Sequence, residues 1–405
     1  MMRWVILAIL IIGLAANQLQ QDIVGLLFPI LQHELSFSAS QIGIITSAFV
    51  IGLIAGYILM TLITVFAGSR WGLAIGFGGA AVASFASIGA DNFTFLLVYR
   101  FSLGFFTAAL IPATVQAIRE WFPAPLRPLA IGLVLAFSGS VFSSLYIYFI
   151  RDINWHISLA LPGIPVFIVA ILCAFLAKPP PVRDASPRLN AAAVVSSIML
   201  VLGLFLTTAI FIDLGTFLVT YLYETGINLQ SSSISSLIIA FGGSLGALFS
   251  GVIACVLIYI FRKSSKIRAA VLTVCGLLLP LTGLIRYVQG QVTITLLSFF
   301  AMAGCFGIMV LLYAGVADTL PVRGVAIATA IGGLAMAIGS MIFPYAFGSI
   351  VDQFGYGSAF LMIGGIGVIA WLVVSIPGWF IKQPDAAAPE VRAAVVPPPI
   401  GSAGA

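Results

Sequence analysis

The sequence predicts an all-helical membrane protein with twelve transmembrane helices in two six-helix bundles. Three observations lead to this fold class: the composition, the spacing of the apolar runs and a pattern shared by the two halves of the chain. Of the 405 residues, 61% are hydrophobic and only 7% are charged. No soluble domain of this size has enough interior to bury so much apolar surface.

Apolar runs recur along the whole chain and are separated by short polar segments. A helix of about 20 apolar residues crosses the hydrocarbon core of a bilayer, and longer runs tilt or emerge from it. The predicted spans are residues 5–32, 41–63, 71–90, 94–117, 127–150, 157–177, 191–222, 233–261, 267–288, 292–316, 323–346 and 357–381.

A central segment, "KPPPVRDASPRLN", combines proline with charge and divides the spans six and six. Such a composition is typical of a linker between two bundles. The last residues are rich in Ala and Pro without apolar periodicity, which favours disorder. The predicted organisation is an N-terminal six-helix bundle at 1–178, a cytoplasmic linker at 179–190, a C-terminal six-helix bundle at 191–381 and a disordered cytoplasmic tail at 382–405.

The two halves share features at matching positions. A shift of about 192 residues places "LSFSAS" (35–40) over "INLQSS" (227–232). In the same way "FPAPLRPLAIG" (122–132) matches "LPVRGVAIATA" (320–330), each after the fourth span of its half. Repeats of this kind predict bundles related by a pseudo-two-fold axis. They are typical of secondary transporters that hold the substrate near the bilayer midplane and work by alternating access.

Lysine and arginine fall mainly on one side of the predicted topology. With the N-terminus inside, all but three of the 17 are cytoplasmic; Arg151 and Arg286 are external and Arg100 lies within the membrane. Because cytoplasmic loops collect positive residues, we expect both termini in the cytoplasm and the protein in the cell inner membrane. The same bias accounts for the formal net charge of +5, so no nucleic-acid partner is expected.

The reactive residues show no pattern of an enzyme or a metal site. Cys173, Cys255, Cys275 and Cys305 lie within predicted spans and share no metal-ligand spacing, so their expected role is packing. No nucleophile, base and orienting group occur together in a motif, and no Walker A loop is present. We therefore expect no catalytic residue, metal or cofactor, and a monomer embedded in lipid.

Several local motifs point to one transporter family: "GSRWG" at 68–72, "YRFSLG" at 99–104 and "GSIVDQFGY" at 348–356. At these residues the sequence resembles the major facilitator superfamily, over all twelve spans. A sharper resemblance is to its anion:cation symporter branch, which implies transport of organic anions with protons or sodium. The residues that carry it are Asn17, Leu19, Pro29, Leu35, Ser36, "QIG" at 41–43, "SAF" at 47–49, Arg100, Gly104, Pro112 and "EWFP" at 120–123.

The chain departs from the branch at its charged positions. The Asp-Arg pair of the branch falls on Gln20 and Gln21, and its glutamate in the fourth span falls on Thr107. The acid and base that the superfamily carries after the second span fall on Val65 and Phe66. Because that loop motif forms a charge lock at the cytoplasmic side in the outward-facing state, we expect this lock to be built from other residues or to be weaker.

Three ionisable residues lie at membrane depth, namely Asp22, Arg100 and Asp213. Such residues cost several kcal/mol unless they are paired or hydrated, so they are candidates for the site. We predict Asp22 and Asp213 as protonation sites, since a carboxylate takes up a proton in a dry cavity and releases it in a wet one. In the alternative, Asp22 and Arg100 form an ion pair that fixes the first span against the fourth, and Asp213 is merely hydrated.

The first span carries an unusual set of amides. At about 100° per residue, Gln18, Gln21 and Asp22 share one face, and Gln20 points to a neighbouring helix. Arg100 is predicted either to hold a substrate carboxylate or phosphate bidentately or to act as counter-ion to Asp22. The predicted substrate-binding set is Arg100, Gln18, Gln21, Asn17, Tyr146 and Tyr313, and the predicted gating residues, placed where the family has inter-bundle contacts, are Arg70, Arg119 and Arg127.

These features predict proton-coupled uptake of a small organic anion. Three alternatives stay open: a proton-driven exporter of amphipathic compounds, an uncoupled facilitator, and a non-transporting receptor on a transporter fold. Drug antiporters of the superfamily carry a Gly-Pro pattern in the fifth span, whereas "LAFSGSVFSSLYIYF" at 135–149 contains no proline, which weighs against the exporter.

Overall fold

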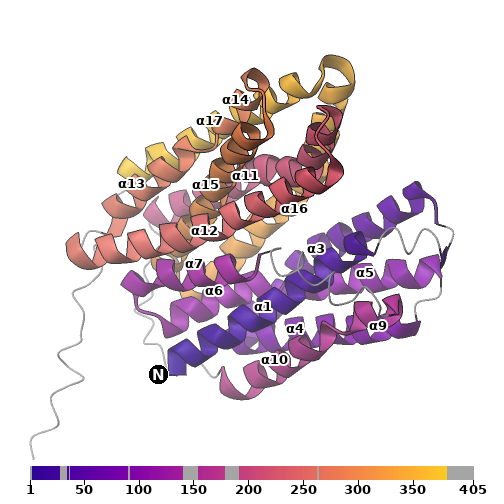
Figure 1. Ribbon diagram of the computed structural model, residues 1–405. Coiled ribbons are helices and arrows are strands. Elements are labelled where there is room, and N and C mark those ends of the chain that lie inside the picture. Colours follow the sequence, from indigo (N-terminus) through magenta and orange to yellow (C-terminus); the bar gives the residue numbers. More distant parts are fainter. Residues whose placement is uncertain are drawn as a thin grey trace, which may run out of the picture.

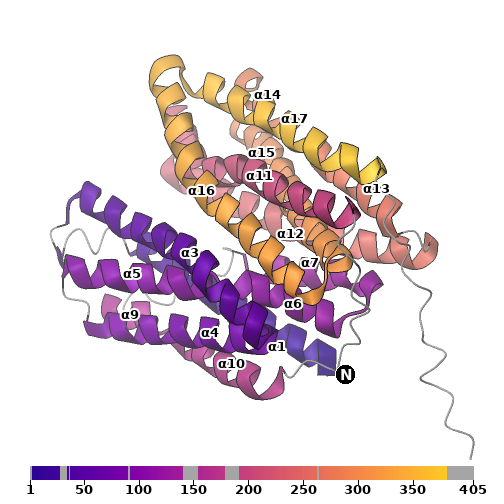
Figure 2. The same ribbon diagram turned by 180° about the vertical axis from the view of Figure 1, so that it is seen from behind.

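The computed structural model describes residues 2–27, 34–35, 37–89, 92–139, 154–177, 191–261 and 264–380, and helices account for the regular structure of all of them. Figures 1 and 2 show two helical bundles, with the first half of the chain in one and the second half in the other. The predicted linker at 179–190, the tail at 382–405 and Tyr146 lie outside the described residues.

The helices follow one another with short connections. The N-terminal bundle contains α1 (Met2–Leu26), α3 (Ala39–Ala67), α4 (Ser69–Ala86), α5 (Phe93–Thr107), α6 (Leu110–Trp121), α7 (Arg127–Phe137), α9 (Trp155–Ala160) and α10 (Gly163–Leu176). The C-terminal bundle contains α11 (Ala191–Glu224), α12 (Leu229–Phe261), α13 (Ser264–Leu277), α14 (Leu281–Leu284), α15 (Gln291–Thr319), α16 (Val322–Phe354) and α17 (Tyr356–Phe380).

Eleven spans of the described chain are long and apolar enough to cross a membrane. The predicted fifth span, 127–150, is described only as far as Phe137 in α7, and its continuation lies outside the described residues. The structure thus confirms an all-helical membrane fold at the positions that the apolar runs indicate.

Prolines divide three of the predicted spans. The span predicted at 94–117 is two helices, α5 and α6, which meet at Ala108 and Ala109. Pro112 has no N–H group, so the carbonyl of Ala108 loses its helical donor and the ladder is interrupted there. Pro162 and Pro280 stand at the corresponding breaks between α9 and α10 and between α13 and α14.

Close approach of glycines brings the two bundles together. A Cβ built at Gly132 of α7 would lie 2.6 Å from the carbonyl oxygen of Ala247, and one built at Gly251 of α12 would lie 2.6 Å from the carbonyl oxygen of Pro128. Only glycine at both positions lets α7 and α12 pack with their backbones in contact. Helix α16 packs in addition against α3 and α6 across the same interface.

Positive side chains gather at one end of the molecule, which we call the basic end. Antiparallel alternation of the helices places there the start of α1, the end of α6 and the starts of α7, α13 and α16. The charged residues at these helix ends are Arg3, Arg119, Arg127, Lys266, Arg268 and Arg323. The contact of Gly251 with Pro128 lies in the halves of α12 and α7 that are nearer to the basic end.

Candidate functional site

Polar side chains of α1 form a network inside the N-terminal bundle. Asn17, only 1% exposed, donates to Gln20 Oε1 and to Thr107 Oγ1, both at 3.1 Å. Gln20 in turn donates to Ser84 Oγ of α4 at 2.8 Å, as its position on the helix predicts. In this conformation these two amides therefore join α1 to α4 and α5, and Thr107, where the branch carries a glutamate, is part of the network.

The adjacent face of α1 is more open. Gln18, Gln21 and Asp22 are all partly buried. Gln18 Nε2 donates to Asp22 Oδ1 at 3.0 Å, and Gln21 Nε2 donates to Asn17 Oδ1 at 3.0 Å. We call these three side chains and Arg100 the polar patch, since the contacts described next bring Arg100 to the same place.

Arg100, whose side chain is 4% exposed, links α5 to α1 and α3. Its Nη1 donates to the backbone carbonyl of Gln21 at 2.9 Å, and the guanidinium lies 4.9 Å from the ring centroid of Phe49. The charges of Arg100 and Asp22 interact electrostatically. Gly104, one turn further along α5, lies against the backbone of Phe49, so α5 and α3 approach closely there.

Asp213 lies in α11 of the C-terminal bundle and is fully buried. Neither carboxylate oxygen has a hydrogen-bond partner among the described residues. A buried carboxylate without partners is unfavourable when ionised. The repeat relates Asp213 to the region of Asp22, but the described contacts do not join it to the polar patch.

Tyr313, in α15, lies apart from the polar patch. Its side chain is 4% exposed. Tyr57, in α3 of the other bundle, packs on Gly333 of α16. Nothing in the sequence singles out Tyr57, because a single tyrosine in an apolar helix is more often an interface anchor than a ligand.

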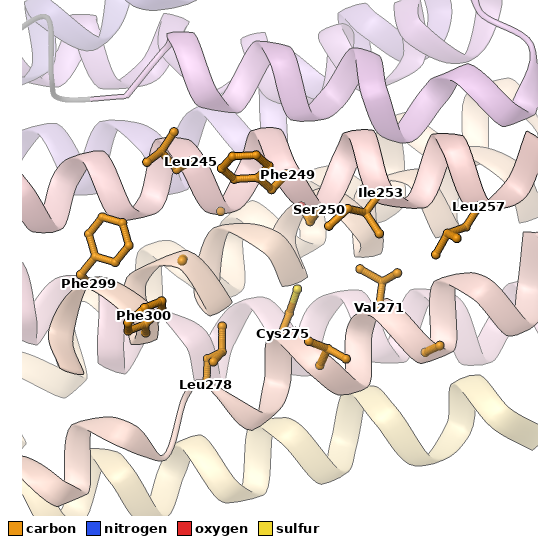
Figure 3. A pocket seen from close by; sticks show the side chains of 14 residues that line it. Leu245, Phe249, Ser250, Ile253, Leu257, Val271, Cys275, Leu278, Phe299 and Phe300 are labelled. Atoms are coloured by element: carbon orange, nitrogen blue, oxygen red, sulfur yellow. The ribbon is translucent and has the colours of Figure 1, made fainter. Parts of the chain in front are cut away.

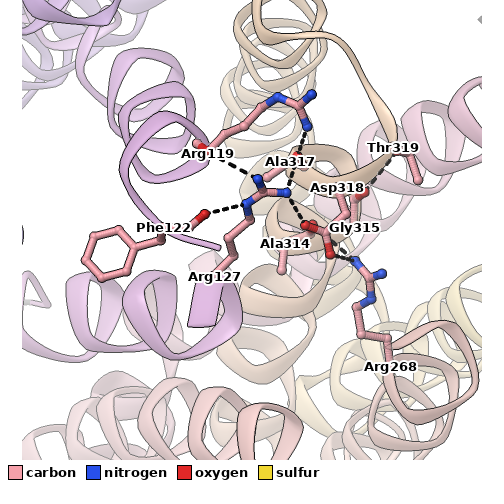
Figure 4. A network of polar contacts seen from close by, with 9 residues as sticks. All are labelled: Arg119, Phe122, Arg127, Arg268, Ala314, Gly315, Ala317, Asp318 and Thr319. Atoms are coloured by element: carbon pink, nitrogen blue, oxygen red, sulfur yellow. Dashed lines mark hydrogen bonds and ion pairs between the residues drawn. The ribbon is translucent and has the colours of Figure 1, made fainter. Parts of the chain in front are cut away.

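An ionic cluster joins the bundles at the basic end (Figure 4). Asp318, in the last turn of α15, binds Arg127 of α7 at 2.5 Å and Arg268 of α13 at 2.7 Å. Arg119 of α6 donates to the carbonyl of Ala317, which also accepts from Arg127 at 3.1 Å. Two predicted gating residues thus contact the opposite bundle. The acid that binds Arg127 was missed, although it stands two residues before the "LPVRG" repeat.

Arg70, the third predicted gating residue, makes its described contacts within the N-terminal bundle. It donates from Nε to the carbonyl of Ala174 in α10 at 2.6 Å, and its guanidinium lies 5.0 Å from the ring centroid of Trp71. In this conformation Arg70 therefore fixes α4 to α10.

A separate groove lies on the C-terminal bundle between α12, α13 and α15 (Figure 3). Its volume is about 440 Å³, and its lining is almost wholly apolar, including Phe249, Ile253, Val274 and Phe300. These four side chains are exposed, so the groove opens on the outer surface of the bundle. It offers no charged group to a polar solute. No cluster of potential metal ligands occurs among the described residues.

The two-bundle helical fold, the polar first span and the inter-bundle ionic cluster define a membrane transporter class. The family model of the Major Facilitator Superfamily matches residues 10–284, and the chain belongs to this family. The recognition made from the local motifs is confirmed.

Relatives within the family include sugar-acid transporters. The chain is 29% identical over 187 residues to a hexuronate transporter of Escherichia coli (strain K12), covering 44% of this chain and 42% of that protein. It is 26% identical over 320 residues to a hexuronate transporter of Bacillus subtilis (strain 168), covering 70% of this chain and 73% of that protein. The chain thus spans about two fifths of the length of the first of these relatives.

Solved structures agree on the fold. The structure of FucP, a Major Facilitator Superfamily transporter in the outward conformation, superimposes with a TM-score of 0.71 at 16% identity, covering 95% of this chain and 100% of that one. Because the chain belongs to a family of transporters, it is not an enzyme.

Proposed function

We propose that this protein is a secondary transporter that takes up a sugar acid of the hexuronate type together with protons. The observation that carries the proposal is the polar patch, in which one guanidinium, one carboxylate and two amides gather on α1 and α5. A sugar acid presents one carboxylate and several hydroxyls, which is the complement of that set. The hexuronate transporters among the relatives support the same substrate class.

Arg100 is proposed to hold the substrate carboxylate, and Gln18 and Gln21 to bind its hydroxyls. Asp22 and Asp213 are proposed as the protonation sites, one in each bundle. Asp213 supports this role by its complete burial without a partner, since a group in such a place is neutral until water reaches it.

We infer that the basic end faces the cytoplasm, because positive residues collect on that side of a membrane. The ionic cluster of Asp318, Arg127, Arg268 and Arg119 is then a cytoplasmic gate. It takes the place of the loop lock whose charges are replaced by Val65 and Phe66.

Purified protein in liposomes loaded with unlabelled D-galacturonate tests this function. External labelled D-galacturonate should exchange into the vesicles, and D-galactose, which lacks the carboxylate, should compete poorly. Absence of exchange for hexuronates would contradict the proposal, and absence of flux for organic anions, amino acids and drugs alike would favour a receptor.

An uncoupled facilitator is the second candidate. It is favoured by Gln20 and Thr107, which are occupied with structural hydrogen bonds where the related branch carries acids. A facilitator should exchange labelled D-galacturonate across the liposome membrane. An imposed proton gradient should not drive accumulation of the sugar acid inside the vesicles.

A further inference from the structure

The apolar groove on the C-terminal bundle runs along the helices (Figure 3). Its lining on α12 begins at Leu245, in the middle of the helix, and ends at Leu257, four residues before the helix ends at Phe261. At about 1.5 Å of rise per residue, the groove is about 18 Å long and begins about 6 Å from the basic end of α12. The hydrocarbon of one leaflet is about 15 Å thick, so the groove extends over the depth of the leaflet at the basic end.

Small residues make this face of the bundle hollow. Gly246 of α12 packs on α15, where a built Cβ would lie 2.2 Å from the carbonyl oxygen of Ala303. Ala270 of α13 lines the same groove. Large apolar side chains line it as well and stay exposed, among them Phe249 (57%) and Phe300 (47%). The result is an open apolar channel at a depth where lipid chains surround the protein.

The dimensions of the groove fit a single hydrocarbon chain. Dividing the volume of about 440 Å³ by the length of about 18 Å gives a mean cross-section of about 24 Å². A helix of another protein is about 10 Å across, which corresponds to about 80 Å². The groove is therefore too narrow for a helix and takes an extended chain.

A positive charge stands at the end of the groove nearer to the basic end. Lys266 of α13 lies four residues before Ala270 and eight before Val274, which both line the groove, so the three share one helical face. Lys266 is exposed, and helical side chains lean toward the N-terminus, which in α13 is the basic end. Arg268, by contrast, is buried and bound to Asp318. Lys266 thus lies at the level of lipid headgroups.

We propose that the groove binds one acyl chain of an anionic phospholipid and that Lys266 holds its phosphate. An acyl chain that enters the groove leaves one apolar surrounding for another, so the groove contributes shape and the charge contributes selectivity. Anionic lipids are typical of the cytoplasmic leaflet, the side on which we infer the basic end to lie. The site lies outside the polar patch and does not depend on the identity of the substrate.

Photoaffinity labelling tests the position of the site. Phosphatidylglycerol with a diazirine in one acyl chain is added to the purified protein in detergent, and labelled peptides are identified by mass spectrometry after irradiation. Labels should concentrate around Ile253 and Val274. Unlabelled phosphatidylglycerol should displace the probe about 5-fold better than phosphatidylethanolamine with the same chains, the effect of about one lysine. Labels spread evenly over both bundles, or equal displacement by the two lipids, would overturn the proposal.

Lys266→Gln tests the headgroup contact. This variant should lose the preference for phosphatidylglycerol, so that both lipids displace the probe equally well. Arg323→Gln is the control, because Arg323 is also an exposed cation in the first turn of a helix at the basic end. A preference that is retained in Lys266→Gln, or lost equally in both variants, would contradict the contact.

Ala270→Phe tests the groove itself, because the ring occupies the space of the chain. Labelling of the groove should fall several-fold while the unfolding temperature stays that of wild type. Ala8→Phe is the control, since Ala8 is exposed and lies six residues from the start of α1 at the basic end, as Ala270 does in α13. Undiminished labelling in Ala270→Phe would overturn the proposal. Absence of labelling in a wild type with the mass of two chains would assign the groove to a second copy.

Discussion

At the scale of single residues, the amides of α1 divide into two kinds. Asn17 and Gln20 are buried and bonded to Thr107 and Ser84, whereas Gln18 and Gln21 stay partly open beside Arg100. The first pair holds α1 in the bundle, and the second pair is partly exposed, as the proposed role in substrate binding requires. The sequence predicted Asn17 as a substrate ligand; its described contacts in this conformation are with protein side chains, and the substrate role remains a prediction.

Asn17→Ala should destabilise the protein, because it removes the amide that donates to Gln20 Oε1 and to Thr107 Oγ1. Side-chain hydrogen bonds between transmembrane helices contribute about 0.5–2 kcal/mol, so the unfolding temperature in detergent should fall by several degrees. Ser47→Ala, at an exposed position of α3, is the matched control and should leave it unchanged. An equal unfolding temperature for Asn17→Ala and wild type would contradict the structural role.

Arg100→Lys should weaken binding of the sugar acid while keeping the charge. A lysine cannot form the planar, bidentate contact with a carboxylate, so we expect a Kd for D-galacturonate raised about 10-fold. Arg286→Lys is the control, since Arg286 is exposed at the opposite end. Titration calorimetry measures the effect; equal affinity in Arg100→Lys and wild type would assign Arg100 to structure alone.

At the scale of helices, most of the fold was predictable and the cross-bundle contacts were not. Apolar periodicity is local, so it located the spans to within a few residues and missed only the proline breaks such as the one near Pro112. The ion pair between Arg127 and Asp318 joins residues that are 191 positions apart in the sequence. The sequence around either residue does not indicate which residue it contacts. Tyr57 and Gly333 meet for the same reason, through packing that no local pattern reports.

Asp318→Asn should loosen the closed basic end, because it removes the ion pair that joins Arg127 of the N-terminal bundle to the C-terminal bundle. Loss of one partner from a largely buried pair costs about 3 kcal/mol, which corresponds to roughly a 100-fold shift in a two-state equilibrium. Spin labels on Phe66→Cys of α3 and Phe261→Cys of α12, both exposed at the basic end, measure the separation of the bundles, since the native cysteines are buried. Asp352→Asn at the opposite end of α16 is the control, and an unchanged distribution in Asp318→Asn would exclude the cluster as a gate.

At the scale of the whole molecule, the described features form two layers along the proposed transport path. The polar patch lies far from the basic end, and the ionic cluster closes that end. The contact of Gly251 of α12 with Pro128 of α7 also lies toward the basic end, so this end is the closed side of this conformation. The chain belongs to the Major Facilitator Superfamily. In a transporter that works by alternating access, one side of the molecule is sealed while the other is open, so a closed basic end is expected in one of its conformations.

Proton-driven accumulation tests the central claim most directly. Liposomes containing wild type or the Asp22→Asn plus Asp213→Asn variant receive an imposed proton gradient, and uptake of labelled D-galacturonate is followed with and without a protonophore. The account predicts that wild type accumulates the sugar acid above its external concentration and that the variant only equilibrates it, with exchange retained. Equal accumulation by both proteins would contradict the account.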